Sequence, residues 1–293
     1  MLQAIKLLRP HQWVKNTFVF LPAFFAGHLF DGKNFVLLLQ GFFAFSIVAS
    51  SIYILNDYRD IEADRLHPKK KLRPLASGQV KPIVAFILMA ILITAGLTTA
   101  FLLSKSFFSL LTFYLILNVG YCFGLKNISL VDIFIVASGF LMRALAGGWI
   151  LNIFISQWLV IMVFLLALFL ALAKRRDDIL MFITSGKVMR KTIKSYNLEF
   201  VNSSLTMISG VIVVAYLMYT ISPEVIARMK SDQVYFTTIF VVAGVMRYLQ
   251  IAMVEENSGS PTKILYSDKF IIFTIAGWLL SFYVIIYLPN FLR

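Results

Sequence analysis

A short charged stretch between long apolar segments carries the side chains best suited to chemistry. It runs from residue 56 to residue 78 and reads NDYRDIEADRLHPKKKLRPLASG. Asp57, Asp60 and Asp64 are three and four residues apart, so on a helix they share one face. Three carboxylates on one face repel one another unless a cation lies among them, and hard oxygen ligands of this kind suit Mg²⁺ shared with substrate phosphates. The spacing therefore predicts a magnesium site made by all three aspartates.

Basic residues follow the aspartates closely. Pro68, Pro74 and Gly78 are expected to end the helix, which leaves the basic residues on a loop that folds back toward the carboxylates. Two interpretations stay open for the lysines: ligands of substrate phosphates, or residues of a polar cytoplasmic loop that follow the positive-inside rule. The basic residues of this stretch that follow the aspartates are Arg65, Lys69, Lys70, Lys71 and Arg73.

The composition excludes an ordinary soluble domain. Hydrophobic residues make up 60% of the chain and the mean hydropathy is +0.85. The formal charge of +13 indicates cytoplasmic loops that face anionic lipid, or polyanionic substrates, and does not call for nucleic acid. The single cysteine, Cys122, excludes an intrachain disulfide and argues against a zinc site. Residues 1–15 lack the apolar core of a cleavable signal peptide.

The apolar runs predict an all-α, polytopic membrane protein with about nine spans. Basic residues set the orientation, because about twenty of the 27 lysines and arginines fall in the N-terminal segment and in every second loop. The N-terminus and the two large polar loops, near 56–81 and 174–196, are therefore expected in the cytoplasm, with Arg293 outside. The expected spans lie near 13–29, 35–55, 83–103, 107–125, 130–151, 158–173, 200–221, 234–254 and 270–288.

The second polar loop opens with basic residues. Lys174, Arg175 and Arg176 either bind a second phosphate-bearing substrate or only anchor the loop on the cytoplasmic side. Asp177 and Asp178 follow, but adjacent residues point to different faces of a helix, so they make a poor metal clamp.

Two charged residues belong to the expected span 130–151. Arg143 lies deep in it, and because a charge is unfavourable there, the position predicts a phosphate or carboxylate partner. Asp132 lies near its start, where it is expected to cap the helix, to pair with Lys126, or to be an acid that supports the residues of the site.

The pattern NDxxDxxxD at residues 56–64 resembles the first aspartate-rich motif of the UbiA superfamily of intramembrane prenyltransferases. Four further segments resemble the decaprenyl-phosphate phosphoribosyltransferases within that superfamily, and residues 260–262 and 267–268 also fit. In aromatic-accepting members a second aspartate-rich motif stands where this chain has Lys174 and its neighbours. The four segments are 8–16 (LRPHQWVKN), 73–78 (RPLASG), 139–147 (GFLMRALAG) and 173–175 (AKR).

The resemblance implies one UbiA-like transmembrane domain over residues 1–293, with a central cavity open to the cytoplasm, in the cell inner (plasma) membrane. It implies Mg²⁺-dependent transfer of 5-phosphoribose from phosphoribosyl pyrophosphate to a polyprenyl, decaprenyl-type phosphate in envelope biosynthesis. The implied catalytic and metal-binding residues are Asp57, Asp60 and Asp64. The implied substrate-binding residues are Asn56, Lys15, Lys71, Arg73, Arg143, Lys174 and Arg175.

Two other functions are weighed against this one. An ordinary UbiA-type prenyltransferase would use the same aspartates to bind a prenyl diphosphate and would alkylate an aromatic or haem acceptor. A lipid transporter or membrane scaffold would not need an ordered acidic triplet beside basic residues. The sequence leaves open the isoprenoid length, the downstream glycan and whether the chain forms a homo-oligomer.

Overall fold

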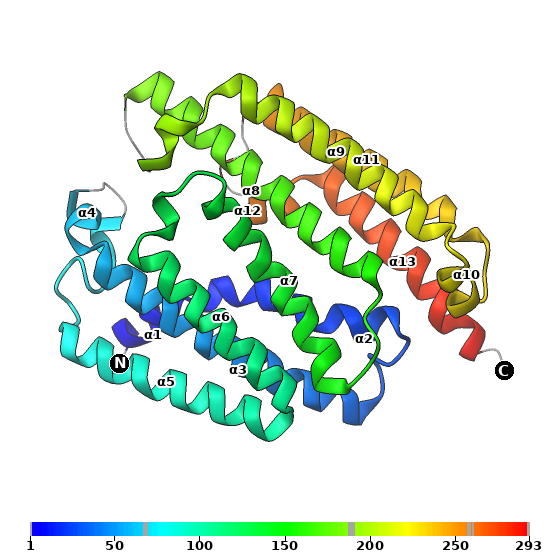
Figure 1. The fold of residues 1–293 in the computed structure, drawn as a ribbon, viewed down its shortest axis with the longest axis horizontal. Coiled ribbons are helices and arrows are strands. Elements are labelled where there is room, and N and C mark those ends of the chain that lie inside the picture. Colours follow the sequence, from blue (N-terminus) through cyan, green and yellow to red (C-terminus); the bar gives the residue numbers. More distant parts are fainter. Residues whose placement is uncertain (1, 67–69, 187–190, 257–258, 260, 292–293) are drawn as a thin grey trace. The chain divides into compact units, whose positions relative to one another are not determined.

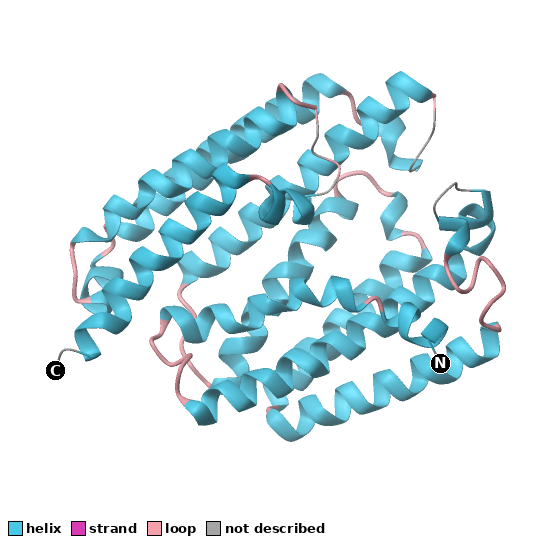
Figure 2. Ribbon diagram, turned by 180° about the vertical axis from the view of Figure 1, so that it is seen from behind, coloured by secondary structure: helices cyan, strands magenta, loops and turns pink. Residues whose placement is uncertain are grey.

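The computed structural model describes residues 2–66, 70–186, 191–256, 259 and 261–291. Every regular element in these ranges is a helix (Figures 1 and 2). The chain divides into two compact units, the first made of residues 1–126 and 139–155 and the second of residues 127–138 and 156–293. The helix α7 (Val131–Leu151) contributes to both. The prediction of a single domain over the whole chain stays a prediction.

Unit 1 is built around α3 (Gly32–Arg59), which packs against α5 and α6 and against the N-terminal elements. The Asp31 carboxylate caps α3 by accepting from the backbone N–H of Lys33 at 3.0 Å. Gly96 of α5 lets α5 and α3 approach closely, because a Cβ there would lie 3.1 Å from the backbone oxygen of Ala44. The other elements are α1 (Leu2–Leu8), η1 (Pro10–Phe20), α2 (Leu21–Phe25), α4 (Ile61–Leu66), η2 (Lys70–Leu72), α5 (Pro82–Leu103), α6 (Lys105–Phe123) and η3 (Leu125–Asn127).

Unit 2 pairs α8 with α9 and α11 with α13. Gly186, at a φ of 67°, ends α8 in the left-handed conformation that glycine adopts without strain. A chain of hydrogen bonds joins three elements, since Tyr216 Oη lies 2.6 Å from both Thr237 Oγ1 and Trp278 Nε1. The elements are α8 (Gln157–Ser185), η4 (Lys191–Ser195), α9 (Leu198–Thr220), α10 (Pro223–Met229), η5 (Gln233–Thr237), α11 (Thr238–Met253), α12 (Pro261–Ser267) and α13 (Lys269–Phe291).

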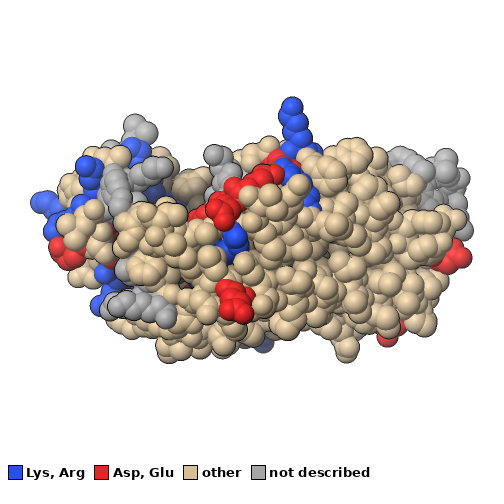
Figure 3. All heavy atoms as spheres, turned by 90° about the horizontal axis from the view of Figure 1, so that it is seen from above, with Lys and Arg blue, Asp and Glu red and all other residues tan. Residues whose placement is uncertain are grey.

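The described residues include eight helices that are long and apolar enough to cross a membrane, so the chain is a multi-pass membrane protein. Large apolar side chains lie exposed on them, such as Phe273 at 68% and Ile239 at 69%, as lipid-facing positions require. In the view of Figure 3, residues without charge cover most of the surface. The polar loop expected from residue 174 is shorter than predicted, because α8 continues to Ser185 and carries the basic run on a helix.

The expected count of nine spans is not confirmed, because residues 13–29 form two short helices, η1 and α2. This segment nevertheless follows α3 over a long distance: Arg9 pairs with Asp57, and the ring of Phe20 stacks on that of Phe35. From residue 57 to residue 35 is 22 residues, or about 33 Å at ~1.5 Å per residue. That length matches the ~30 Å hydrocarbon core of a bilayer.

Candidate functional site

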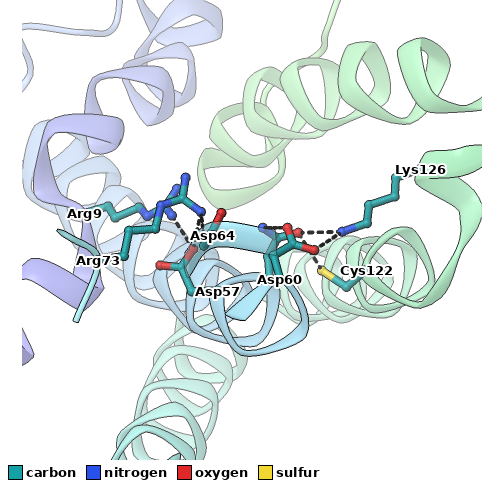
Figure 4. A network of polar contacts seen from close by, with 8 residues as sticks. Arg9, Asp57, Asp60, Asp64, Arg73, Cys122 and Lys126 are labelled. Carbon is teal, nitrogen blue, oxygen red and sulfur yellow. Dashed lines mark hydrogen bonds and ion pairs between the residues drawn. The ribbon is translucent and has the colours of Figure 1, made fainter. Parts of the chain in front are cut away.

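The aspartate motif lies where α3 ends. Asp60 has a φ of −100°, outside the helical region, and α4 begins with the next residue. Because of this break, the motif residues do not belong to one continuous helix: Asp57 lies on α3 and Asp64 on α4. As a result Asp57 and Asp64 point to one side of the chain, while Asp60 points to the other (Figure 4).

Arg73 joins the first side. Its Nη1 donates to Asp64 Oδ2 at 2.6 Å and to Asp57 Oδ1 at 3.0 Å. Arg9 pairs with the same Asp57 oxygen. Both carboxylates are buried, so two positive charges offset two negative ones in a place that water reaches poorly. We call these four residues, Arg9, Asp57, Asp64 and Arg73, the Arg73 cluster.

Lys126 organises the other side. Its Nζ donates to Asp60 Oδ1 at 2.7 Å and to Asn56 Oδ1 at 3.4 Å. The Asn56 amide nitrogen donates to Asp60 Oδ2 at 3.0 Å, which fixes the orientation of that amide. The Cys122 thiol donates to Asn56 Oδ1 with Sγ at 3.9 Å. We call Asn56, Asp60, Cys122 and Lys126 the Lys126 cluster.

The structure therefore does not form the three-aspartate metal clamp that the spacing predicts. Within the described ranges, no three acidic, histidine or cysteine side chains come close enough to hold a metal ion. The physical reason is that basic side chains neutralise the carboxylates and divide them between two clusters. Two of the carboxylates nevertheless fit a Mg²⁺ ion, which proteins usually bind through one or two carboxylates together with substrate oxygens. Asp57 and Asp64 both lie within hydrogen-bond distance of the same Arg73 nitrogen, so their oxygens are close to one point.

Arg143 is buried, as its place in the span predicts, but its partners are neutral. Its Nε donates to Asn16 Oδ1 at 2.6 Å, its Nη1 to the Gly139 carbonyl at 2.6 Å and its Nη2 to Tyr114 Oη at 2.8 Å. The Phe45 ring centroid lies 5.0 Å from the guanidinium carbon, a cation–π distance. Arg143 thus ties η1 to α6 and α7, and its role as a substrate ligand stays a prediction.

Two other predicted substrate ligands lie in unit 1. Lys15 is half-buried on η1, and Lys71 is exposed on η2. Lys69, one of the basic residues after the aspartates, lies outside the described residues.

In unit 2 the basic run of α8 is divided between surface and interior. Lys174 is exposed, whereas Arg175 is buried between Asp132, at 2.8 Å, and Asp178, at 2.7 Å. The Tyr196 hydroxyl also donates to Asp132, at 3.1 Å. Burial raises the pKa of Tyr196 to about 12, so it stays a neutral donor at physiological pH. Among the described residues Asp132 therefore pairs with Arg175 and Tyr196, which leaves it the role of an acid that holds another charged residue in place, and Arg175 already has two carboxylate partners.

Arg176 is buried too and fastens three elements of unit 2. Its Nε donates to Asn202 Oδ1 of α9 at 2.8 Å, and its Nη1 donates to the carbonyl of Ala252 in the last turn of α11. A carbonyl in that turn has no partner within its own helix. Arg176 therefore acts as a structural cap of α11, and its expected role with Lys174 and Arg175 in binding a second phosphate-bearing substrate stays a prediction.

Two residues of the candidate site, Arg9 and Lys126, are not among the site residues that the sequence predicts. Arg9 was visible within LRPHQWVKN, but nothing in the sequence shows that it reaches Asp57, 48 residues later. Lys126 follows an apolar span as an isolated basic residue, and its pattern is that of any positive-inside lysine. Only its distance from Asp60 distinguishes it.

Comparisons with known proteins place this geometry in context. The sequence profile of the UbiA prenyltransferase family matches residues 17–185. The chain is 31% identical over 290 residues to the decaprenyl-phosphate phosphoribosyltransferase of Corynebacterium glutamicum, and the alignment covers 97% of this chain and 86% of that protein. It is 31% identical over 284 residues to the protein of that name from Mycolicibacterium smegmatis, covering 94% and 89%. A solved UbiA homologue from Archaeoglobus fulgidus, bound to GPP and Mg²⁺, has a TM-score of 0.69 at 19% identity and covers 97% of this chain and 99% of that one.

Proposed function

Because the chain belongs to the UbiA prenyltransferase family and is an enzyme of that superfamily, we propose that it is a phosphoribosyltransferase. It moves 5-phosphoribose from phosphoribosyl pyrophosphate to a polyprenyl phosphate of the decaprenyl type and releases pyrophosphate. Two relatives named for this activity align with almost the whole chain. Those two alignments carry the choice of donor, and one structural observation supports a pyrophosphate leaving group: three cations, Arg9, Arg73 and Lys126, converge on the carboxylates of one short motif.

The two clusters of unit 1 are proposed to bind the donor's pyrophosphate. The side chains of Arg73 and Lys126 are 25% and 22% exposed, so each is accessible while being held by a carboxylate. Negative charge develops on the pyrophosphate as it leaves, and cations fixed beforehand stabilise that charge. Asp57 and Asp64 would hold Mg²⁺, while Asp60 and Asn56, on the other side of the motif, would keep Lys126 in place. When bound, Mg²⁺ supplies further positive charge to neutralise the leaving group.

The bond changes need few protein groups. An oxygen of the acceptor phosphate bonds to C1 of the ribose, the bond from C1 to the pyrophosphate oxygen breaks, and its electron pair leaves with pyrophosphate. Because a phosphate dianion is already nucleophilic, no strong general base is required. Lys174 is the proposed ligand of the acceptor phosphate, since it is exposed on α8. Arg175 would hold that part of α8 in place through Asp132 and Asp178.

The decisive assay uses purified protein in lipid nanodiscs with Mg²⁺, labelled phosphoribosyl pyrophosphate and polyprenyl phosphates of several lengths. Mass spectrometry is expected to show a polyprenyl phosphate that has gained one ribose 5-phosphate unit. If phosphoribosyl pyrophosphate is untouched while a prenyl diphosphate alkylates an aromatic acid, the chain is an ordinary prenyltransferase and our assignment is wrong. The chain length that gives the highest kcat/KM identifies the acceptor.

We also propose that this chemistry takes place on the cytoplasmic side of the inner (plasma) membrane. The proposal is supported by the distribution of basic residues and by the bilayer-long course of η1 beside α3. In a Cys122→Ala background, a cysteine at Lys71 should react with an impermeant thiol reagent only in inside-out vesicles. A cysteine at Lys105, which begins α6 just after α5 ends, should react only in intact cells. The reverse pattern would refute the orientation.

A further inference from the structure

The segment before residue 17 lies along one face of α3. Asn16 Nδ2 donates to Ser46 Oγ at 2.8 Å, and Trp13 Nε1 donates to Ser50 Oγ at 3.0 Å. Arg9 lies over the ring of Tyr53 at 5.3 Å and pairs with Asp57. These four α3 residues are separated by four, three and four positions, which is the spacing of one helix face. The N-terminal segment is thus built into the wall of the site.

This segment is also the part of the site that the family-wide profile leaves out. The UbiA profile begins at residue 17, whereas the relatives named decaprenyl-phosphate phosphoribosyltransferase align over 97% and 94% of the chain. The solved UbiA homologue bound to GPP also covers 97% of this chain, so the presence of the segment does not separate the two groups of proteins and only its side chains can do so. A side chain that a phosphoribosyl donor requires and a prenyl diphosphate does not is expected there.

The two donors differ by a phosphate. Both carry a pyrophosphate leaving group, but phosphoribosyl pyrophosphate also carries a 5-phosphate of about −1.5 to −2 charge near neutral pH. A second anionic group needs a further cationic ligand, preferably a guanidinium, whose planar fork matches two phosphate oxygens. Arg73 and Lys126 are proposed for the pyrophosphate, so the fork must come from elsewhere.

Arg9 has the required properties. Its backbone is left-handed, with φ 50° and ψ 58°, although it is not glycine and precedes Pro10. This conformation is sparsely populated and is kept where the surroundings enforce it; here it turns the chain from α1 into η1. The Arg9 side chain is 19% exposed, and among the described residues its guanidinium donates to one oxygen of Asp57. The other N–H groups of the Arg9 guanidinium are the proposed donors to a ligand.

We propose that Arg9 determines donor specificity by binding the 5-phosphate of phosphoribosyl pyrophosphate. This inference rests on the proposed function and deepens it. Arg9 then separates phosphoribosyl donors from prenyl diphosphates, while Arg73 and Lys126 serve the pyrophosphate that both donors share.

The test compares two donors on the same variants. One is phosphoribosyl pyrophosphate, and the other is ribofuranosyl 1-pyrophosphate, which has a hydroxyl in place of the 5-phosphate. Arg9→Ala is expected to lower kcat/KM for the first donor about ten- to hundredfold, the effect of one lost charge-assisted hydrogen bond. The value for the second donor should change less than about threefold. Arg9→Lys, which keeps the charge without the fork, should fall between wild type and Arg9→Ala.

A matched control and a binding measurement complete the test. Arg59→Ala removes an exposed cation of α3 that lies over the Phe123 ring, and it should affect neither donor. In calorimetry, Arg9→Ala should weaken binding of ribose 5-phosphate about tenfold or more and leave inorganic pyrophosphate unchanged. If both donors or both probes weaken equally, Arg9 acts only by positioning Asp57 and the inference is wrong. If wild type does not use phosphoribosyl pyrophosphate at all, the proposed function itself fails.

Discussion

Arg73→Ala tests the charge arrangement of the site without relying on catalysis. Arg73 bridges Asp57 and Asp64, whose side chains are 2% and 3% exposed. Its removal leaves Asp64 without the guanidinium, whereas Asp57 keeps Arg9. The variant therefore contains an additional uncompensated charge in a buried place.

The expected loss follows from that geometry. Breaking a buried ion pair by removing one partner typically lowers the free energy of unfolding by about 3–5 kcal/mol. We expect about 3 kcal/mol, because Asp57 remains paired and Arg73 is partly exposed. Arg65→Ala is the matched control: Arg65 lies on the same stretch, but its partner Glu62 is exposed, so the change should be about 1 kcal/mol or less.

Thermal unfolding in detergent at pH 7, followed by tryptophan fluorescence, measures both changes. In Mg²⁺-free buffer Arg73→Ala should unfold several degrees below wild type. A cation that binds the folded state stabilises that state, and in this variant Mg²⁺ no longer competes with Arg73 for the carboxylates. Added Mg²⁺ should therefore raise the unfolding temperature of Arg73→Ala more than that of wild type. An equal Mg²⁺ effect in both proteins would contradict the view that Asp57 and Asp64 form the cation site.

Three further predictions concern the metal, the lysine and pH. Asp57→Asn should abolish turnover, and EDTA should do the same to wild type until Mg²⁺ is restored; activity that persists in EDTA would exclude the metal. Lys126→Ala should lower kcat about ten- to hundredfold in the transferase assay, and an unchanged kcat would remove it from the site. The hydrogen bond from Arg247 lowers the pKa of Asp268 in the folded protein. The ionised Asp268 therefore stabilises the folded state above pH ~4, and this contribution is lost as the pH falls below that value. When the unfolding temperature is measured from pH 3 to 6, Asp268→Asn should therefore show a smaller fall toward low pH than wild type.

The sequence by itself determined the membrane fold and the motif. Apolar runs of bilayer length are a local property of the chain, and eight of the nine expected spans correspond to helices. Their bounds lie close to the predicted ones except in α8, which continues to Ser185 beyond the expected end at residue 173. The spacing of Asp57, Asp60 and Asp64 likewise predicts a site at the polar end of α3, where the structure gathers Arg9, Arg73 and Lys126. Both inferences concern contacts between residues that are near in sequence, which periodicity describes well.

Only the tertiary structure decided how the charges are paired. The partners of Asp57 lie 48 and 16 residues away, and Lys126 lies 66 residues from Asp60. Periodicity carries no information at such separations. The basic run likewise predicts Arg175 as a substrate ligand but not its two carboxylate partners, Asp132 and Asp178, which only the packing brings to it. Because a charge placed in a poorly hydrated interior must find a partner wherever the packing brings one, the pairing follows from the assembled helices and not from the spacing along the chain.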